Sequence, residues 1–268
     1  MKEQEQQLDL SLVIPCYNEA GRIELLYKDL AVFMEQWHAS LEVIIINDGS
    51  KDNTLVLLQE HPVYKKYSNI ISIYSQENTG KGGALKNGVL RAKGNFILTL
   101  DADMATAPAE LFRWIDLENG QLSDNTIYIG SREHTDSTIN NVAGERKAAG
   151  NIFNFIVRML TPLKAHDTQC GFKLYPARLA KNLFTDLKTY GWAHDVELLY
   201  HAVLLNASIK EMPVYWTAIA DSKIRVLRDG FNMFLEVFRI VITTKLQSHD
   251  EKALSQPAQH RLQYKPKE

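Results

Sequence analysis

The first hundred residues alternate between short apolar runs and segments with helical periodicity. The apolar runs have the length of buried strands and cover residues 10–15, 41–46, 70–74 and 96–100. The intervening helices are predicted over residues 23–37, residues 52–59 and a segment that ends at Arg91. This alternation predicts an α/β fold with a mainly parallel, doubly wound sheet and helices on both faces. In such sheets the ligand binds beyond the carboxyl ends of the strands, so the loops after these four strands are the expected site.

The second half of the chain has a less regular pattern. Strands are predicted near residues 127–130 and 209–215. Helices are expected over residues 148–160, 177–187, 196–205 and 230–245. Neither a repeat nor a low-complexity linker divides the chain, so we expect one domain over residues 10–247. Residues 1–9 and 248–268 are polar tails, and the second tail is expected to be disordered.

The charge balance argues against a nucleic-acid partner. Thirty Lys and Arg residues stand against 32 Asp and Glu residues, which gives a formal net charge of −2. Sequence-independent binding of duplex nucleic acid requires a strong basic field, and this chain has none. The two cysteines, Cys16 and Cys170, belong to no Cys-Xaa-Xaa-Cys pair. Neither a zinc site nor a disulfide framework is therefore expected, which fits a reducing cytoplasm.

The hydropathy pattern predicts neither a signal peptide nor a membrane-spanning helix. The first ten residues are polar and acidic, and no apolar run reaches the length of about 18 residues that a spanning helix needs. We therefore expect a cytoplasmic protein whose contact with a membrane is peripheral. The helices over residues 148–160 and 230–245 have broad apolar faces, with Arg158 and Arg239 among them. These faces fit a membrane surface, but they fit the core or a dimer interface equally well, so the oligomeric state stays open.

The most informative motif is the segment Leu98-Thr99-Leu100-Asp101-Ala102-Asp103, in which an apolar strand ends in two carboxylates one residue apart. Two ionised carboxylates this close are costly unless a cation or hydrogen-bond donors compensate them. Mg²⁺ or Mn²⁺, which prefer hard oxygen ligands, are the usual remedy, so Asp101 and Asp103 are the predicted metal ligands. An isolated pair fits a helix cap beside a solvated Asp equally well. Its position after the fourth strand favours a site for metal and diphosphate.

A glycine-rich loop, Asn78-Thr79-Gly80-Lys81-Gly82-Gly83, follows the third predicted strand. Its glycines allow a phosphate to approach the backbone closely, and Lys81 supplies a positive charge. The loop lacks the Walker A pattern, and no Gly-Xaa-Gly-Xaa-Xaa-Gly fingerprint follows the first strand. Taken alone, it also fits a plain turn with a helix cap.

The ends of the four strands predicted in the first hundred residues each carry a motif. They are Val13-Ile14-Pro15-Cys16-Tyr17-Asn18-Glu19, Asn47-Asp48-Gly49-Ser50, Asn78-Thr79-Gly80-Lys81-Gly82 and Asp101-Ala102-Asp103. Together they resemble glycosyltransferase family 2, whose nucleotide-binding fold is called GT-A. Three segments of the second half add to this, namely Gly130-Ser131-Arg132-Glu133-His134, Asp167-Thr168-Gln169-Cys170-Gly171-Phe172-Lys173 and Trp192-Ala193-His194-Asp195-Val196-Glu197-Leu198-Leu199-Tyr200. Within the family they resemble the dolichyl-phosphate glucosyltransferases, and the resemblance spans residues 10–245.

The resemblance implies an inverting enzyme that transfers a hexose from a nucleotide sugar to polyprenyl or dolichyl phosphate at the cytoplasmic face of a membrane. It favours UDP-glucose over GDP-mannose, since the related mannose synthases usually have Gln where Ala105 stands. On this interpretation residues 10–130 form the donor half of the domain. Residues 131–247 form the acceptor half.

Carried over residue by residue, the resemblance also implies a donor-nucleotide site. Its predicted members are Pro15, Tyr17, Glu19, Asn47, Asp48, Lys81, Asp101 and Ala102. Asp48 would read the base or hold its loop. The family commonly has two aspartates where this chain has Asn47 and Asp48, so Asn47 offers only a neutral acceptor.

A phosphate acceptor needs cations more than it needs a general base. A phosphate monoester is already ionised near neutral pH, so no group has to remove a proton from it. Arg132 and Arg146 are the predicted phosphate ligands because a guanidinium can bind phosphate through two hydrogen bonds, and Gln169 is a weaker candidate. The predicted catalytic residues are Asp103, Arg132 and Asp195. A solvated helix start remains the alternative for Arg146, and compensation of a helix dipole remains the alternative for Asp195.

Other functions stay open at this point. A glycan hydroxyl acceptor is one, although the Asp167 to Lys173 segment argues against it. A GDP-mannose-dependent polyprenyl-phosphate mannosyltransferase is another. A non-catalytic nucleotide-sugar sensor or scaffold is the third, although Asp101, Asp103 and Arg132 are all intact. A processive synthase is set aside, since its Gln-Xaa-Xaa-Arg-Trp motif is missing.

Overall fold

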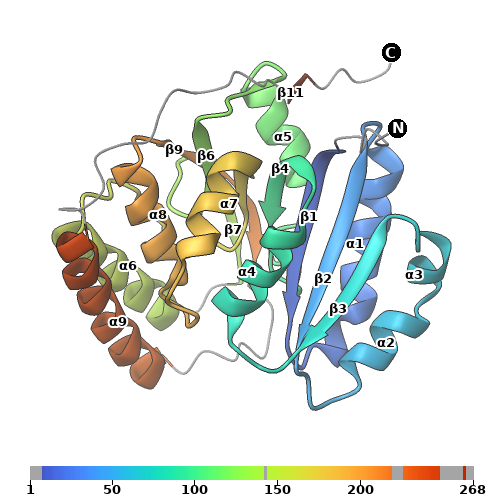
Figure 1. Ribbon diagram of the computed structural model, residues 1–268, viewed down its shortest axis with the longest axis horizontal. Coiled ribbons are helices and arrows are strands. Elements are labelled where there is room, and N and C mark those ends of the chain that lie inside the picture. Colours follow the sequence, from blue (N-terminus) through green and yellow to red (C-terminus); the bar gives the residue numbers. More distant parts are fainter. Residues whose placement is uncertain (1–7, 142–143, 219–225, 248–261, 264–268) are drawn as a thin grey trace.

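The computed structural model describes residues 8–141, 144–218, 226–247 and 262–263. Among these residues the central element is a seven-stranded sheet with the strand order β3-β2-β1-β4-β8-β6-β9. Its strands are β1 (Leu8–Cys16), β2 (Leu41–Asp48), β3 (Ile71–Gln76), β4 (Gly94–Thr99), β6 (Thr126–Ser131), β8 (Lys173–Pro176) and β9 (Ser208–Pro213). Figure 1 shows helices on both sides of this sheet.

Strands β1 to β4 form a purely parallel half of the sheet. β1 pairs with β2 and β4, and β2 pairs with β3. The connections between them contain η1 (Ala20–Arg22), α1 (Ile23–Gln36), α2 (Thr54–Glu60), α3 (Pro62–Lys66) and α4 (Lys81–Arg91). The predicted alternation of strands and helices is therefore observed in this half.

The second half contains an antiparallel insertion that the sequence pattern does not predict. β8 lies between β4 and β6 and runs antiparallel to both, whereas β9 runs parallel to β6. The strand escapes prediction because Lys173-Leu174-Tyr175-Pro176 is short, begins with a charge and ends with proline. Since β8 runs in the opposite direction, the segment that leads into it lies at the same sheet edge as the carboxyl ends of β4 and β6.

The remaining elements surround this sheet. The helices are α5 (Glu110–Leu117), α6 (Gly144–Leu160), α7 (Ala177–Asp186), α8 (His194–Leu204) and α9 (Val226–Gln247). Short strands form two small pairs, β7 (Thr138–Asn140) with β10 (Tyr215–Thr217) and β5 (Gln121–Leu122) with β11 (Leu262–Gln263). The strand predicted over residues 209–215 is thus divided at Val214 into β9 and β10. Apart from β11, the predicted disordered tail over residues 248–268 lies outside the described residues.

Alternating strand residues supply two hydrophobic cores, one on each face of the sheet. On β1, Leu12 and Ile14 join the core that contains α1 and α5, while Val13 joins the core that contains α4, α7 and α8. Burial on both faces explains why the parallel strands are nearly continuous apolar runs. Trp114 of α5 is fully buried and meets Phe172 edge to face, with ring centroids 4.9 Å apart. This arrangement confirms the doubly wound α/β prediction.

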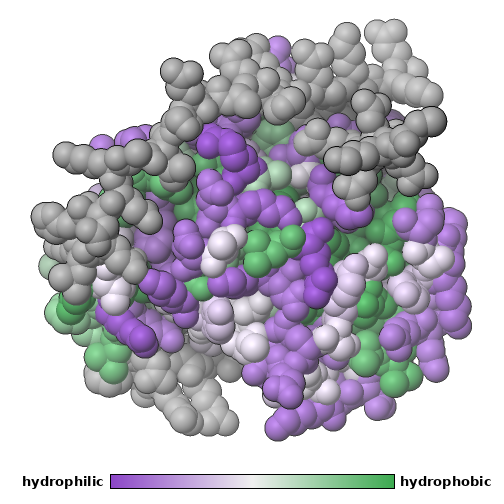
Figure 2. Space-filling model, in the orientation of Figure 1, coloured by the Kyte–Doolittle hydropathy of each residue, from purple (hydrophilic) through white to green (hydrophobic). Residues whose placement is uncertain are grey.

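Helices α6 and α9 pack side by side at one end of the molecule. Their outer faces carry a set of exposed apolar side chains that we call the apolar patch, namely Ile152, Phe155, Met159, Phe234, Leu235, Phe238 and Ile242. Figure 2 shows apolar side chains gathered at the left edge of the molecule, over these two helices. In the part of the chain that the structure describes, no helix is both long enough and apolar enough to cross a bilayer.

Candidate functional site

A cavity of about 460 Å³ opens at the edge of the sheet where β1, β2 and β4 end and β8 begins. Its lining combines strand ends from both halves of the chain. The charged and polar side chains in the lining are Tyr17, Glu19, Arg22, Asp48, Asn78, Lys81, Asp101, Asp103, Arg132, Gln169 and Asp195. This is the position that a parallel α/β sheet predicts for a ligand.

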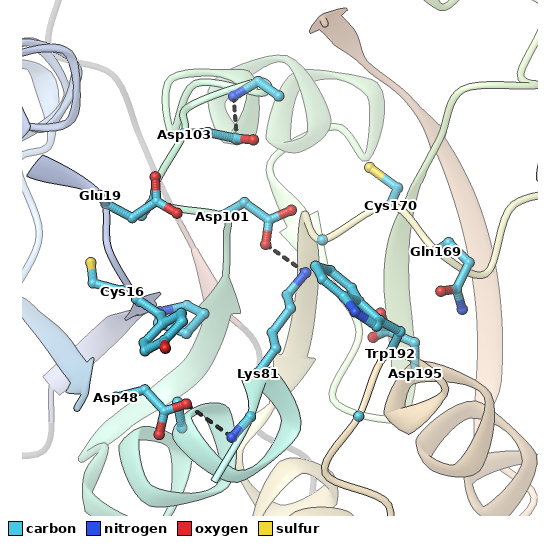
Figure 3. A pocket seen from close by; sticks show the side chains of 18 of the residues that line it. Cys16, Glu19, Asp48, Lys81, Asp101, Asp103, Gln169, Cys170, Trp192 and Asp195 are labelled. Carbon is cyan, nitrogen blue, oxygen red and sulfur yellow. Dashed lines mark hydrogen bonds and ion pairs between the residues drawn. The ribbon is translucent and has the colours of Figure 1, made fainter. Parts of the chain in front are cut away.

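Lys81 and Asp101 form an ion pair at the centre of the cavity (Figure 3), with 2.5 Å between Lys81 Nζ and Asp101 Oδ1. Lys81 is the first residue of α4, so its side chain projects from the end of the helix into the cavity. Burial alone would lower the pKa of Lys81, but the carboxylates of Asp101, Asp195 and Asp103 raise it. The Lys81 ammonium is therefore charged at neutral pH and available to an anionic ligand.

Asp103 lies beside this pair, and its negative charge is less well compensated. Its Oδ1 accepts a hydrogen bond of 3.0 Å from the Ala105 amide. Burial, and after it the negative charge of Asp101, raises the pKa of Asp103. Met104 adopts a left-handed φ of 54°, a conformation that is unusual for a non-glycine residue and is typical of functional turns. Ala102 and both carboxylates line the cavity.

Asp48 holds the glycine-rich loop in place. Its buried carboxylate accepts hydrogen bonds of 2.9 Å from the amides of Thr79 and Gly80, and one of 2.7 Å from Gln76 Nε2. Gly80 has a φ of 93°, and a Cβ at this position would lie 2.7 Å from the Tyr190 carbonyl oxygen. Of the two roles considered for Asp48, these contacts describe the one that fixes the loop.

Asn47 does not face the cavity. Its Nδ2 donates to Ser75 Oγ at 3.3 Å, and its Oδ1 accepts from the Ser50 amide at 3.3 Å. It is absent from the described residues that line the cavity. Its hydrogen bonds connect β2 to β3 and to the following turn.

The loop after β1 supplies the wall opposite α8. Pro15, Tyr17 and Glu19 line the cavity, as the resemblance implies. Arg22 lines it too and was not predicted from the sequence. Its Nη1 lies 2.7 Å from Glu19 Oε2, so the spacing of three residues between an acid and a base was the available signal. Arg22 adds a second positive charge on the side of Asp103.

Arg132 is anchored by a buried partner that the sequence reasoning did not assign. Arg132 Nε and Nη2 donate to the two carboxylate oxygens of Asp167 at 2.7 and 2.9 Å, and the Arg132 amide donates to Oδ2 at 3.0 Å. Burial would raise the pKa of Asp167, but the charge and hydrogen bonds of Arg132 lower it. A guanidinium has five N–H donors, so this pairing leaves three for a ligand.

The segment between Asp167 and β8 completes this wall. Gln169 and Cys170 line the cavity, as does Gly171, where a Cβ would lie 2.3 Å from Asp101 Oδ2. Glycine is therefore required for the segment to approach the carboxylate pair. Burial raises the pKa of the Cys170 thiol to about 11, so this thiol is protonated at neutral pH.

Asp195 and Glu197, at the start of α8, have different contacts. Asp195 lines the cavity, and its Oδ1 lies 2.8 Å from Nζ of the buried Lys173. Glu197 instead accepts hydrogen bonds of 2.8 Å from the amides of Lys188 and Thr189, which fixes the loop that leads to Trp192 in the lining.

Burial alone would raise the pKa of Asp195, but His194, when its ring is protonated at acid pH, and the ammonium groups of Lys173 and Lys81 lower it. Its carboxylate is therefore ionised at neutral pH. Arg146 belongs to α6, but its side chain lies outside what the structure describes, so its predicted contact with phosphate stays a prediction.

Asp101 and Asp103 supply only part of the ligand set that a divalent cation needs. Among the described residues, no three His, Cys, Asp or Glu side chains form a cluster that could hold a metal. Mg²⁺ is nevertheless commonly held by one or two carboxylates together with substrate phosphates, and Asp101 and Asp103 offer that donor set. Burial, and after it the charge of Asp101, raises the pKa of Asp103, and a bound cation would offset both of these costs of the ionised carboxylate. These residues therefore fit a metal that binds together with a diphosphate.

Residues 11–184 match the family described as "Glycosyl transferase family 2". The dolichyl-phosphate beta-glucosyltransferase of Dictyostelium discoideum is 36% identical over 242 residues, which is 86% of this chain and 73% of the relative. The human protein of the same name is 34% identical over 228 residues, or 80% of this chain and 69% of the relative.

Solved structures share the fold at low sequence identity. Glucosyl-3-phosphoglycerate synthase from Mycobacterium tuberculosis, in complex with UDP, superposes with a TM-score of 0.60 at 15% identity, covering 88% of this chain and 79% of that one. S. aureus TarS, also in complex with UDP, gives a TM-score of 0.55 at 21% identity, covering 91% and 67%. With a GT-A architecture, strand ends that meet at one cavity and a match over most of its length, the chain belongs to glycosyl transferase family 2.

Proposed function

We propose that this glycosyltransferase transfers glucose from UDP-glucose to a polyprenyl phosphate such as dolichyl phosphate, with inversion at the anomeric carbon. The names of the relatives support this acceptor and this sugar. The structural observation that carries the proposal is the pairing of two charged walls across one cavity. Lys81, Asp101 and Asp103 form one wall, and Arg132, anchored by Asp167, belongs to the other.

The reaction forms a bond between an acceptor phosphate oxygen and the anomeric carbon and breaks the bond from that carbon to the nucleoside diphosphate. The acceptor phosphate is already ionised, so the site needs no general base. Arg132 holds the acceptor phosphate through its free N–H groups and offsets its repulsion by the donor diphosphate. Lys81 stabilises the negative charge that develops on the departing diphosphate. Asp195 accepts hydrogen bonds from hydroxyls of the glucose.

Asp101 and Asp103 are the residues that would hold Mg²⁺ or Mn²⁺ in this site. Such an ion, when bound, supplies further neutralisation of the leaving diphosphate. Lys81 pairs with Asp101 before the donor binds, and its positive charge also helps to neutralise the leaving diphosphate. The chelator EDTA is expected to abolish transfer, and Mg²⁺ or Mn²⁺ is expected to restore it.

The apolar patch supports a lipid acceptor presented at a membrane surface. Phe153 of α6 and Met233 of α9 line the cavity, so the helices that carry the patch also reach the site. Arg158 and Arg239 lie on the same two helices and suit anionic headgroups. We therefore place the acceptor chain along α6 and α9, with its phosphate at Arg132.

The test is transfer of labelled sugar into an extractable lipid. Purified protein is incubated with Mg²⁺, a short polyprenyl phosphate and either UDP-glucose or GDP-mannose carrying a label in the sugar. The proposal expects label in the organic phase with UDP-glucose and far less with GDP-mannose. The reverse preference would make the enzyme a mannosyltransferase. Donor turnover with no lipid label from either donor would overturn the lipid-phosphate acceptor.

A further inference from the structure

Lys173, the first residue of β8, is a fully buried lysine next to the site. Lysine is almost never fully buried unless its ammonium is paired. Here Nζ lies 2.8 Å from Asp195 Oδ1 and also donates to the Cys170 carbonyl oxygen. Lys173 is not among the described residues that line the cavity, so it acts from behind the wall.

The two partners of Lys173 belong to different parts of the site. Asp195 comes from the start of α8 and faces the cavity. Cys170 belongs to the segment over residues 167–171, whose Asp167 anchors Arg132 and whose Gly171 packs against Asp101. A single ammonium therefore joins a proposed sugar ligand to the segment that supports the proposed phosphate ligand.

The neighbouring His194 does not supply the same contact. Its Nδ1 lies 2.8 Å from the Gly191 carbonyl oxygen, so Nδ1 carries a proton. Its Nε2 lies 3.5 Å from Asp195 Oδ2, is buried and has no hydrogen-bond partner. Burial lowers the pKa of His194, so the ring is neutral near pH 7 and Nε2 has no hydrogen to give. Lys173 provides the hydrogen bond that fixes the orientation of Asp195.

We propose that Lys173 is a positioning residue that fixes Asp195 and the segment over residues 167–171 relative to each other, so that the donor sugar and the acceptor phosphate meet in one geometry. The inference rests on the proposed function, because it assigns the sugar to Asp195 and the phosphate to Arg132. Lys173 itself contacts neither substrate.

The first experiment replaces the lysine with a side chain of similar length and no charge. Lys173→Met is expected to lower kcat/KM for glucose transfer from UDP-glucose to a short polyprenyl phosphate by about 10–100-fold, as for other residues that orient ligands from behind. Binding of UDP alone, measured by calorimetry, is expected to keep its affinity and stoichiometry. UDP lacks the sugar, so a weaker affinity for UDP at unchanged stoichiometry would contradict a role that is limited to positioning the sugar and the acceptor.

The matched control is Lys181→Met. Lys181 Nζ also donates to backbone carbonyl oxygens, those of Val89, Leu90 and Ala92, but it lies at the far end of α4 from the cavity. Its loss tests what removal of a partly buried lysine does to the fold alone. The control is expected to lose thermal stability and keep the transfer rate. An equal loss of transfer in both variants would contradict a specific role for Lys173.

A double-mutant cycle with Asp195→Asn separates positioning from independent effects. If Lys173 acts through Asp195, the double variant Lys173→Met with Asp195→Asn transfers glucose as fast as Asp195→Asn alone. If instead the losses of transfer rate in the two single variants multiply in the double variant, the inference is wrong. This comparison uses only the double variant and Asp195→Asn, in which Lys173 keeps the Cys170 carbonyl oxygen as a partner, so it does not require Lys173→Met alone to fold.

A failure of the proposed function can be distinguished from a failure of the positioning role of Lys173. If the wild-type protein transfers nothing to polyprenyl phosphate, the same cycle is measured on its slow hydrolysis of UDP-glucose, in which water replaces the acceptor. Coupling between Lys173 and Asp195 in hydrolysis would keep the positioning role while the lipid acceptor is abandoned. Independent losses in hydrolysis would overturn the positioning role.

Discussion

The two walls of the cavity each contain an ion pair, and the pairs are built differently. Between Lys81 and Asp101 both side chains line the cavity, with exposed fractions of 17% and 38%. Between Arg132 and Asp167 only the guanidinium lines it, because Asp167 is 1% exposed. The first pair can exchange its contacts with an incoming diphosphate. The second holds a cation in a fixed place and leaves three of its donors free.

The difference reflects how each charge reaches the site. Lys81 and Asp101 come from the ends of successive elements in a regular parallel half, α4 and β4. Arg132 and Asp167 are 35 residues apart, and the antiparallel direction of β8 brings them to the same edge. We call the wall with Lys81, Asp101 and Asp103 the donor wall and the wall with Arg132 and Asp167 the acceptor wall, after their proposed ligands. We expect glucose transfer to be sensitive to charge at the donor wall and to geometry at the acceptor wall.

The largest effect is expected at Asp103. Asp103→Asn keeps the shape and the hydrogen bond from Ala105 but removes the charge that would hold the divalent cation. We expect kcat to fall by roughly 10³-fold, the scale for loss of one important electrostatic contact in a transition state. The matched control is Asp116→Asn, an exposed aspartate on α5, which should transfer glucose at the wild-type rate. Comparable activity in both variants would remove Asp103 from the proposed chemistry.

The next effect tests geometry in the acceptor wall. Arg132→Lys keeps the charge, but one ammonium cannot make two parallel hydrogen bonds to Asp167 and still hold a phosphate. We expect a loss of about 10–100-fold in kcat/KM for polyprenyl phosphate, with UDP binding unchanged. Arg113→Lys, on the surface of α5, is the control. A fully active Arg132→Lys would show that charge alone suffices on this side.

A smaller effect is expected on binding to a membrane. Phe155→Ser combined with Phe238→Ser removes two exposed aromatic side chains from the apolar patch. Burial of a side chain of this kind is worth about 1.5–3 kcal/mol, so sedimentation with phosphatidylglycerol vesicles should weaken by at least about tenfold. Val56→Ser, at an exposed apolar residue on α2 and outside the apolar patch, is the control. Equal vesicle binding by both variants would assign the patch another role.

The smallest effect concerns the stability of the fold against acid, through His194 at the start of α8. Burial lowers the pKa of His194 below its ordinary value of 6.5, so the unfolded chain takes up its proton at a higher pH than the folded chain. The free energy of unfolding should therefore fall as the pH drops below about 6.5. His194→Asn keeps a donor for the Gly191 carbonyl oxygen and removes the titration. Denaturant unfolding at pH 7 and pH 5 should show a smaller loss in this variant, and an unchanged loss would contradict the assignment.

The contrast between the walls also explains what the sequence could predict. β1 to β4 are predicted close to their observed ends, because strands covered on both faces are apolar runs with polar loops after them. The side chains at those ends, such as Asp101 and Lys81, follow from the topology of a parallel sheet. Asn47 shows the limit of this reasoning, since its side chain bonds to Ser75 and Ser50 behind the cavity.

The acceptor wall depends on pairings that no local pattern contains. Asp167 reads as one acid in a polar segment, and its partner Arg132 is far away in the sequence. Lys173 at the start of β8 is fully buried against Asp195, and no local sequence pattern indicates that burial. Only the position of β8 between β4 and β6 brings these groups together. Motifs carried over from a family can suggest such residues, but they do not reveal how the residues are joined.

The central claim is that the acceptor wall receives a phosphate. Its most direct test compares two acceptors with the same short polyprenyl chain, one ending in phosphate and one ending in a hydroxyl, with UDP-glucose as the donor. We expect the wild-type enzyme to glucosylate the phosphate and to leave the alcohol unmodified. Arg132→Lys should reduce the ratio between the transfer rates to the two acceptors. Efficient transfer to the alcohol would contradict the central claim, because that reaction needs a general base and does not need Arg132.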